Sequence, residues 1–134
     1  MANRYCGREA VRRSVGITGS DRDTLLDSFI EMASRRIDRL TDRRYIPLTA
    51  AKSYQYPQRD TRRGWTIYLD EDLLAVTALT KEGDDVTAIA AADYFLEPST
   101  LGPPYSRIEI DLASTAFFSS KDTHQRQVMV TGRL

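Results

Sequence analysis

Apolar residues recur at helical spacing between Ser20 and Pro47. This stretch contains Leu26, Ile30, Ala33, Ile37 and Leu40, which are four, three, four and three residues apart. Such intervals place side chains on one stripe of an α-helix. The stripe is widened by Leu25, Phe29 and Met32 to the broad apolar face of a helix that packs into a core. The pattern predicts a long amphipathic helix over about residues 21–42.

The sequence also predicts where this helix begins and ends. We expect the Ser20 hydroxyl to cap the first turn, and Asp21 and Asp23 to place negative charge at the positive end of the helix dipole. Pro47 prevents helical continuation and disfavours helix at Ile46.

A shorter helix is predicted over residues 7–14, ended by Gly16. Its buried side is expected to contain Ala10, Val11 and Val15, and its solvated polar side Arg8, Arg12 and Arg13. Because the link to the long helix is so short, the two helices are expected to form a helical hairpin.

The pattern changes after Pro47, where aromatic and β-branched residues dominate short segments. Strands are predicted at 52–56, 65–69, 73–81 and 108–112, and from Val128 onward. Polar turns are predicted at 57–64, 70–72 and 82–85. Helices followed by strands predict an α+β fold: an N-terminal helical hairpin with one long helix, then a small antiparallel β unit. We expect a helical part, 1–47, and a β-rich part, 48–134, packed together as one structural domain.

The size and composition of the chain fit that expectation. Its 134 residues suffice for one ordinary domain. The single cysteine, Cys6, excludes an internal disulfide and is interpreted as a buried thiol. There is no apolar run long enough for a membrane span, and the N-terminus lacks the apolar centre of a signal peptide. These features predict synthesis in the cytoplasm and no membrane partner.

The net charge of zero conceals a division along the chain. Residues 1–63 contain fourteen Lys and Arg against eight Asp and Glu, a net +6, and residues 64–134 carry the compensating −6. The two halves can pair within one molecule or between neighbours that assemble head to tail. Two independently solvated faces are an equally good interpretation.

The sequence predicts no catalytic, metal-binding or cofactor site. Cys6 and His124 have no recognisable nucleophile signature around them. The acidic segment Asp70–Asp72 does not match a calcium loop and is interpreted as a turn between strands. Gly83, Asp84 and Asp85 match what a hairpin turn needs, so we prefer a turn to a two-metal site there.

Arginines form two clusters. Arg35, Arg39 and Arg43, four residues apart, share one face of the long helix, and the predicted 57–64 loop contains Arg59, Arg62 and Arg63. Clustered arginines are typical of phosphate contact. Acidic residues are interspersed, however, and salt bridges within or between subunits explain the helical cluster better. The loop is a candidate for contact with DNA or with a partner.

The order of several segments resembles the head–tail connector, or adaptor, proteins of tailed bacteriophages. These segments are REAVRRSVGITGSDRDTLLDSFIEMASRRIDRLTDRRYIP, SYQYP, YLDEDLLAVTALTKEGDDVT, AADYFLEP and VMVTGRL, which together cover nearly the whole chain. The most specific part is IDRLTDRRYIP, which is similar to the family element ID-x-x-T-x-R-x-[FY]-x-P. In that element Tyr45, Ile46 and Pro47 are interpreted as structural residues that position helix against β unit.

The resemblance implies a structural virion protein of the phage neck. Such adaptors form a twelve-subunit ring under the portal protein, extend the DNA channel and dock the next neck or tail component. Genomic DNA would pass through the lumen without sequence-specific binding. Family members commonly continue into a C-terminal helical segment that grips the portal. This sequence does not contain that segment, so we expect a further C-terminal segment to be missing and assign no portal-binding residues.

We expect ring contacts between the basic part of one subunit and the acidic part of the next. The candidate interface residues are Arg35, Arg39 and Arg43 against Asp70, Glu71 and Asp84. Three alternatives stay open: a small nucleic-acid-binding module that uses the arginine loop, a small hydrolase or metal enzyme with a convergent polar site, and a different neck ring such as a stopper or tail terminator.

Overall fold

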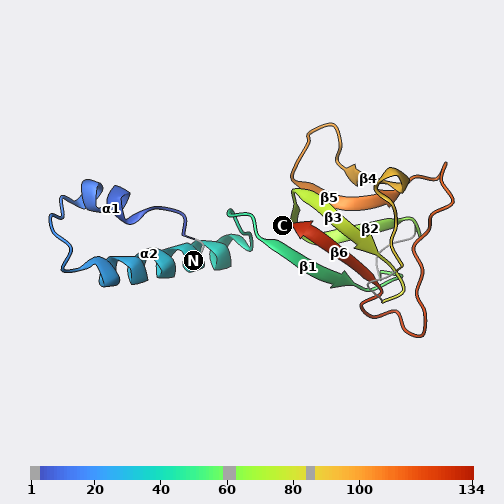
Figure 1. The fold of residues 1–134 in the computed structure, drawn as a ribbon, viewed down its shortest axis with the longest axis horizontal. Coiled ribbons are helices and arrows are strands. Elements are labelled where there is room, and N and C mark those ends of the chain that lie inside the picture. Colours follow the sequence, from blue (N-terminus) through green and yellow to red (C-terminus); the bar gives the residue numbers. More distant parts are fainter. Residues whose placement is uncertain (1–3, 59–62, 84–86) are drawn as a thin grey trace. The chain divides into compact units, whose positions relative to one another are not determined.

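A computed structural model describes residues 4–58, 63–83 and 87–134. The chain divides into two compact units, Met1–Ile46 and Pro47–Leu134, which are described in turn. Within the described ranges the helices are α1 (Arg8–Val15) and α2 (Asp23–Thr41), and the strands are β1 (Thr49–Tyr54), β2 (Thr66–Leu73), β3 (Ala75–Thr80), β4 (Tyr94–Glu97), β5 (Tyr105–Ile110) and β6 (Val128–Arg133), with a short 3-10 helix, η1 (Ala91–Asp93), before β4 (Figure 1). That the two parts pack together as one structural domain stays a prediction.

Unit 1 contains the two helices. The first, α1, ends at Gly16, whose left-handed backbone (φ 71°) lets its N–H donate to the Arg12 carbonyl. The expected capping of α2 by Ser20 is wrong. Its N-cap is Arg22, with no side-chain hydrogen bond, and Ser20 contributes only its backbone carbonyl, which accepts from the N–H of Asp23 at 3.1 Å.

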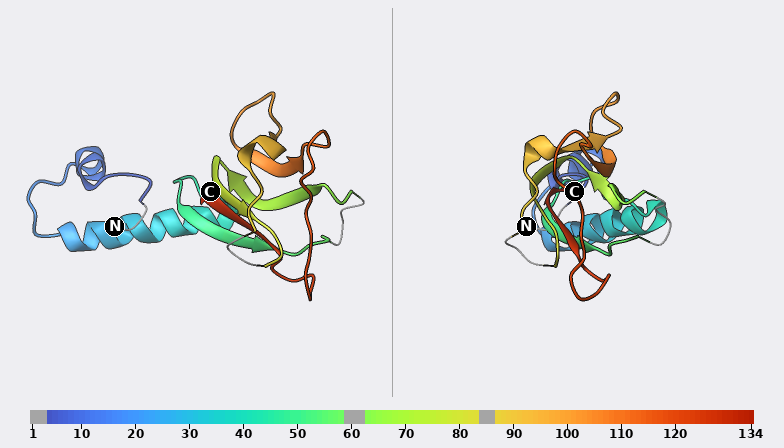
Figure 2. Two further views of the ribbon diagram at one scale, coloured as in Figure 1. Left: turned by 45° about the vertical axis from the view of Figure 1, so that its right-hand side comes forward. Right: turned by 90° about the vertical axis from the view of Figure 1, so that its right-hand side faces the viewer.

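Unit 2 is built from two antiparallel three-stranded sheets, of order β1-β6-β3 and β2-β5-β4, in the part of the chain that the structure describes (Figures 1 and 2). In the first sheet β6 is central, with Lys52 and Leu79 of its two neighbours opposite Val130. In the second β5 is central, with Ile67 of β2 and Leu96 of β4 opposite Ile108. The central strands therefore pair on both edges.

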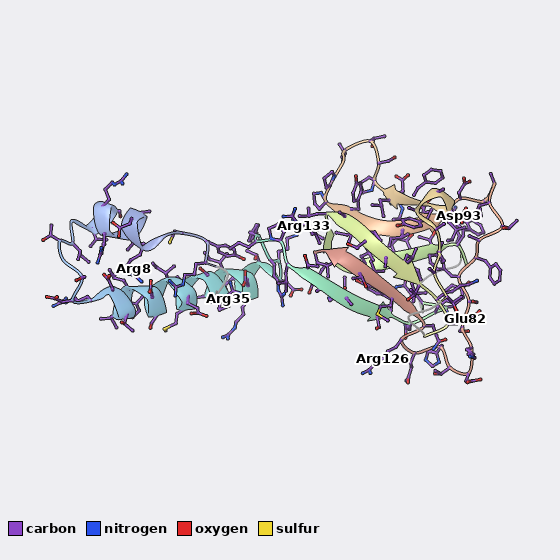
Figure 3. All side chains as sticks on the ribbon, in the orientation of Figure 1. Arg8, Arg35, Glu82, Asp93, Arg126 and Arg133 are labelled. Atoms are coloured by element: carbon purple, nitrogen blue, oxygen red, sulfur yellow. The ribbon has the colours of Figure 1, made fainter. Side chains whose placement is uncertain are left out.

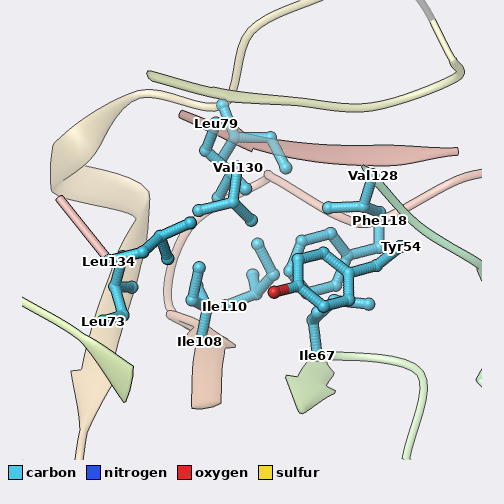
Figure 4. Close-up of a cluster of buried hydrophobic side chains, with 11 residues drawn as sticks. Tyr54, Ile67, Leu73, Leu79, Ile108, Ile110, Phe118, Val128, Val130 and Leu134 are labelled. Atoms are coloured by element: carbon cyan, nitrogen blue, oxygen red, sulfur yellow. The ribbon is translucent and has the colours of Figure 1, made fainter. Parts of the chain in front are cut away.

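The core of the protein lies in unit 2, where side chains from both sheets meet in one cluster (Figure 4). Its most completely buried members are Ile67, Leu73, Leu79, Ile108, Val128 and Val130. Burying each such side chain stabilises a fold by about 1.5–3 kcal/mol. Phe118, from the long segment between β5 and β6, closes the cluster and lies 5.8 Å from the Tyr56 ring.

The predicted fold class is wrong. Six strands in two antiparallel sheets make the described structure mostly β, with only two helices, of 8 and 19 residues. The physical reason is where apolar side chains are buried. No residue of α1 is buried and α2 buries only Ile30 and Ser34, whereas the hydrophobic cluster consists of unit 2 residues. The β unit, which the sequence predicts to be small, contains the hydrophobic core.

Two local predictions in unit 2 also fail. The acidic segment Asp70–Asp72 is not a turn but part of β2. Lys52 of β1 forms ion pairs with Asp70 and Glu71, which offsets the repulsion between neighbouring carboxylates in the strand. The strand predicted at 108–112 is wrong at both ends, since β5 begins at Tyr105 and ends at Ile110, and Leu112 beyond it is exposed. The connection between β4 and β5 projects from its sheet (Figure 2) and carries Leu101, another exposed apolar side chain.

The backbones of β3 and β6 approach each other closely at Gly132. A Cβ atom at this position would overlap the carbonyl oxygen of Ala75, and would also lie 3.1 Å from the Cα of Val76. Because these contacts are with backbone atoms, rotation of a side chain cannot relieve them. Glycine is therefore required there by the spacing of the two strands.

Candidate assembly surface

The apolar side of α2 is exposed. We call it the α2 apolar face, and it consists of Leu25, Phe29, Met32, Ile37 and Leu40. Their exposed fractions range from 42% for Ile37 to 76% for Leu40. The helix thus has the amphipathic pattern of a core element, but these five side chains are left exposed by the described residues.

The opposite side of α2 is covered by the N-terminal segment through ion pairs. Arg4 contacts Asp27 at 2.7 Å, and Arg8 donates to both Asp27 (Nε to Oδ1, 3.0 Å) and Asp23 (Nη1 to Oδ2, 2.8 Å). Arg12 also pairs with Asp23. Arg8 lies where α1 faces α2 (Figure 3). These contacts form a ladder of three arginines and two aspartates between the segment and the helix.

Tyr5 extends this ladder toward the end of α2. Its hydroxyl donates to Asp38 and accepts from the N–H of Tyr45 at 3.0 Å, while its own N–H donates to Ser34 Oγ at 3.2 Å. The Tyr5 and Tyr45 rings meet edge to face, 5.8 Å apart. Desolvation, and then the hydrogen bond to Asp38, raise the pKa of Tyr5, so the hydroxyl stays a donor. These contacts of Tyr45 lie within unit 1, and its role in positioning the helix against the β unit stays a prediction.

Ion pairs connect the two helices. The hydrogen bonds from Arg8 are the main cause of the lowered pKa of Asp27, so this aspartate stays ionised. The prediction that Arg8 and Arg12 lie on a solvated side is wrong, because their partners Asp23 and Asp27 face them from α2. The prediction that α1 buries Val15 is wrong as well, since this side chain is exposed.

The arginines proposed for ring contacts lie on or just after α2. Arg35 pairs with Asp38 at 2.9 Å within the helix (Figure 3). Arg39 is exposed, and Arg43 follows the helix and is exposed too. Among the described residues neither Arg36 nor Arg39 has an ion-pair partner. Their role in ring contacts stays a prediction.

Two of the proposed acidic partners are engaged within unit 2. Lys52 Nζ lies 3.0 Å from Asp70 Oδ2 and 2.9 Å from Glu71 Oε1, and the Tyr54 hydroxyl donates to Asp70 Oδ1 at 2.9 Å. Partial burial alone would raise the pKa of Asp70, but the hydrogen bonds from Lys52 and Tyr54 outweigh it and lower that pKa. This cluster connects β1 to β2, and so one sheet to the other. Asp84, the third acid, lies outside the described residues.

Arg63 is the one member of the arginine loop that the structure describes; Arg59 and Arg62 lie outside the described residues. The Arg63 guanidinium is 5.9 Å from the centre of the Trp65 ring, within cation–π range. Both side chains are exposed. An arginine stacked on an exposed indole can also contact phosphate or a base.

Sequence reasoning missed a second exposed surface, on the β2-β5-β4 sheet. The strand register forms two rows across its outer face: Tyr68, Arg107 and Glu97, and Thr66, Glu109 and Phe95. Tyr68 and Phe95 are each 53% exposed. We call these six residues the outer sheet face; Thr66, at one end of its row, is buried. Their alternation with the buried Ile67 and Ile108 is visible in the sequence, but only the strand register shows that the two aromatics share a face.

Within the described ranges, no group of three or more His, Cys, Asp or Glu side chains is placed to hold a metal ion. No helix among these residues combines the length and apolarity that crossing a membrane requires. Comparison with known proteins adds no identification. No protein-family model, curated protein or solved structure matches this chain.

Proposed function

We propose that this chain is a structural subunit of the neck of a tailed-bacteriophage virion. It is a head–tail connector, or adaptor, that forms a ring of about twelve copies under the portal protein. The ring extends the DNA channel and docks the next neck or tail component. The observation that supports this proposal best is the exposed α2 apolar face.

Exposing an apolar helix face to water is unfavourable in free energy. Each of its large side chains gains about 1.5–3 kcal/mol when it is buried. Contiguous exposed apolar patches mark interaction surfaces on proteins. Among its described residues unit 1 also buries only one apolar side chain, Ile30, so it has little internal packing to lose and much to gain from a partner. An assembling subunit has this property.

The choice of a phage connector among assembling proteins depends on the sequence. The segments from Arg8 to Pro47 and from Tyr68 to Thr87 follow the order seen in connector proteins. The basic first half and acidic second half suit contacts that repeat from one copy to the next, because two different surfaces of one chain then meet.

Native mass spectrometry of the whole chain tests the proposal, alone and mixed with candidate portal protein. We expect a closed oligomer, or a monomer that assembles on the portal. Phe29→Glu should abolish assembly, since it places a charge on the α2 apolar face. Ser28→Glu is the matched control, because it adds the same charge one residue away at an exposed polar position. Equal assembly of the two variants, or a wild-type chain that stays monomeric with the portal, contradicts the proposal.

A second candidate function, nucleic-acid contact, is favoured by the exposed pair of Arg63 and Trp65. It predicts that the monomeric chain binds duplex DNA at low salt, observed as a change in the electrophoretic mobility of the DNA. The affinity should fall steeply as the salt concentration rises. Arg63→Ala should weaken this binding several-fold. A chain that binds no DNA at low salt excludes this function and leaves the connector proposal intact.

A further inference from the structure

We infer that the α2 apolar face of one copy binds the outer sheet face of the next copy. The inference rests on the proposed assembling function and names the two surfaces that meet. Helix packed on sheet is a standard way to bury the apolar side of both elements. Here each element has one side already covered by its own chain and one side left open.

The outer sheet face has the apolar content that such contact needs. Its other side is the core, where Ile67, Ile108 and Leu96 lie opposite one another. Antiparallel sheets commonly keep one face polar and solvated. This face instead presents Tyr68 and Phe95 in neighbouring rows, both more than half exposed. Aromatic side chains are enriched at protein interfaces and supply much of their binding energy.

The charges on the two surfaces are complementary. Arg36 falls four residues after Met32 and four before Leu40, so it lies on the same stripe as the α2 apolar face, and Arg39 adjoins it. The outer sheet face carries Glu97 and Glu109, of which Glu109 pairs with Arg107 at 2.7 Å. Glu97 lies opposite Arg107, whose pKa its charge helps to raise, but among the described residues it forms no ion pair and its carboxylate accepts only from Ser99. Arg36 can therefore meet an available carboxylate.

A second α2 helix is a poorer occupant. In an antiparallel pair of identical helices, Arg36 and Arg39 of one copy would lie opposite the first half of the other α2, near Ser28 and Leu25, which offer no carboxylate. In a parallel pair in register, Arg36 of one copy would lie beside Arg36 of the other, and like charges at short range destabilise a contact.

Because the two surfaces are different and lie on one chain, the contact is heterologous. Each copy offers one helix face and one sheet face, so contacts repeat from copy to copy and close into a ring when the rotation permits. This geometry makes a specific prediction for pairs of variants. A chain with a damaged helix face and a chain with a damaged sheet face still retain one intact contact between them.

Complementation between Phe29→Glu and Phe95→Glu tests this contact. Each variant alone should stay monomeric at concentrations where the wild type assembles, with at least a tenfold weaker self-association. Mixed in equal amounts, they should form a 1:1 heterodimer and no larger species, observed by native mass spectrometry. Leu101→Glu is the control for Phe95→Glu, because it puts the same charge at an exposed apolar position outside the outer sheet face. It should assemble like the wild type.

The outcomes separate the contact from the function. If Phe95→Glu assembles as the wild type does while Phe29→Glu does not, the sheet face is not the occupant and the inference fails, although the connector proposal stands. If both variants are monomeric with unchanged thermal unfolding and their mixture yields no heterodimer, the inference also fails. A wild-type chain that never assembles overturns both. Only the heterodimer together with the assembling Leu101→Glu control supports it.

Discussion

The two units of this chain hold their elements together by different forces. In unit 2, side chains such as Ile67 and Val130 are fully buried between paired strands, and most of the stabilisation comes from removing apolar surface from water. In unit 1, arginines join α1 to α2, while the apolar side of α2 is exposed. Unit 2 contains the hydrophobic cluster of the described structure, whereas the described part of unit 1 buries one apolar side chain, Ile30.

Substitution of Gly132 by alanine should have the largest effect, and it should fall on unit 2. The added Cβ overlaps the Ala75 carbonyl oxygen, so β3 and β6 must separate. We expect a loss of about 4 kcal/mol or more, or failure to fold, measured by urea denaturation. Gly7→Ala in unit 1 is the control: its Cβ meets open space, and its N-cap position limits the loss to about 1 kcal/mol. Equal stability of the two variants would contradict the close approach.

Truncation of a large apolar residue should give opposite results in the two units. Ile108→Ala should destabilise the dilute chain by about 3 kcal/mol, because it opens a cavity in the core. Met32→Ala should change the free energy of unfolding of the dilute chain by no more than about 0.5 kcal/mol, yet weaken assembly in sedimentation velocity. A Met32→Ala chain as unstable as Ile108→Ala would show that the α2 apolar face is already buried.

Removal of the Asp27 charge should loosen unit 1 and leave unit 2 unchanged. Asp27→Asn loses the ion pairs with Arg4 and Arg8, so part of the helical far-UV circular dichroism should be lost while the unfolding transition of unit 2 stays the same. The matched control is Asp21→Asn, which removes an aspartate just before the helix that pairs with no basic residue among those described. A helical signal indifferent to Asp27→Asn would mean that apolar packing holds α1.

Low pH should loosen unit 1 as Asp27→Asn does, because it protonates the Asp27 carboxylate. Arg8 lowers the pKa of Asp27 in the folded chain, so its stabilising contribution is complete above the unfolded value of about 3.9. That contribution is lost as pH falls through the folded pKa. The helical signal of the wild type should therefore decrease below about pH 4, and this decrease should be smaller in Asp27→Asn.

A smaller effect is expected where unit 2 uses polar contacts. Tyr54→Phe removes the hydrogen bond to Asp70 but keeps the buried ring, and should cost about 1 kcal/mol. Tyr68→Phe is the control, since its ring is exposed on the outer sheet face and its side chain forms no hydrogen bond among the described residues. It should be neutral in chemical denaturation. A neutral Tyr54→Phe would show that Lys52 alone connects Asp70 to β1.

The sequence predicts helices and strands better than it predicts which segments bury their apolar faces. The spacing of Leu26, Ile30 and Ile37 indicates a helix, but periodicity cannot distinguish a face covered by the same chain from one left for a partner. This is why the α2 pattern alone predicts a core element. Arg8 was interpreted as solvated for a related reason, since its partners lie 15 and 19 residues further along the chain.

The same limit explains the errors in unit 2. Three consecutive acids at Asp70–Asp72 resemble a turn until Lys52 is known to lie beside them, and that neighbour comes from the pairing of distant segments. The outer sheet face depends on a register that joins residues 66–68, 95–97 and 107–109. Strand alternation places each aromatic on a face but does not say which strands are adjacent.

Hydrogen–deuterium exchange of the dilute and the assembled chain tests the central claim most directly. We predict that the amides of α2 exchange rapidly in the dilute chain and become protected on assembly, because another copy then covers the α2 apolar face. The amides of β5 and β6 should be protected in both states. Equal protection of α2 before and after assembly would contradict the account, since it would show that unit 1 is complete without a partner.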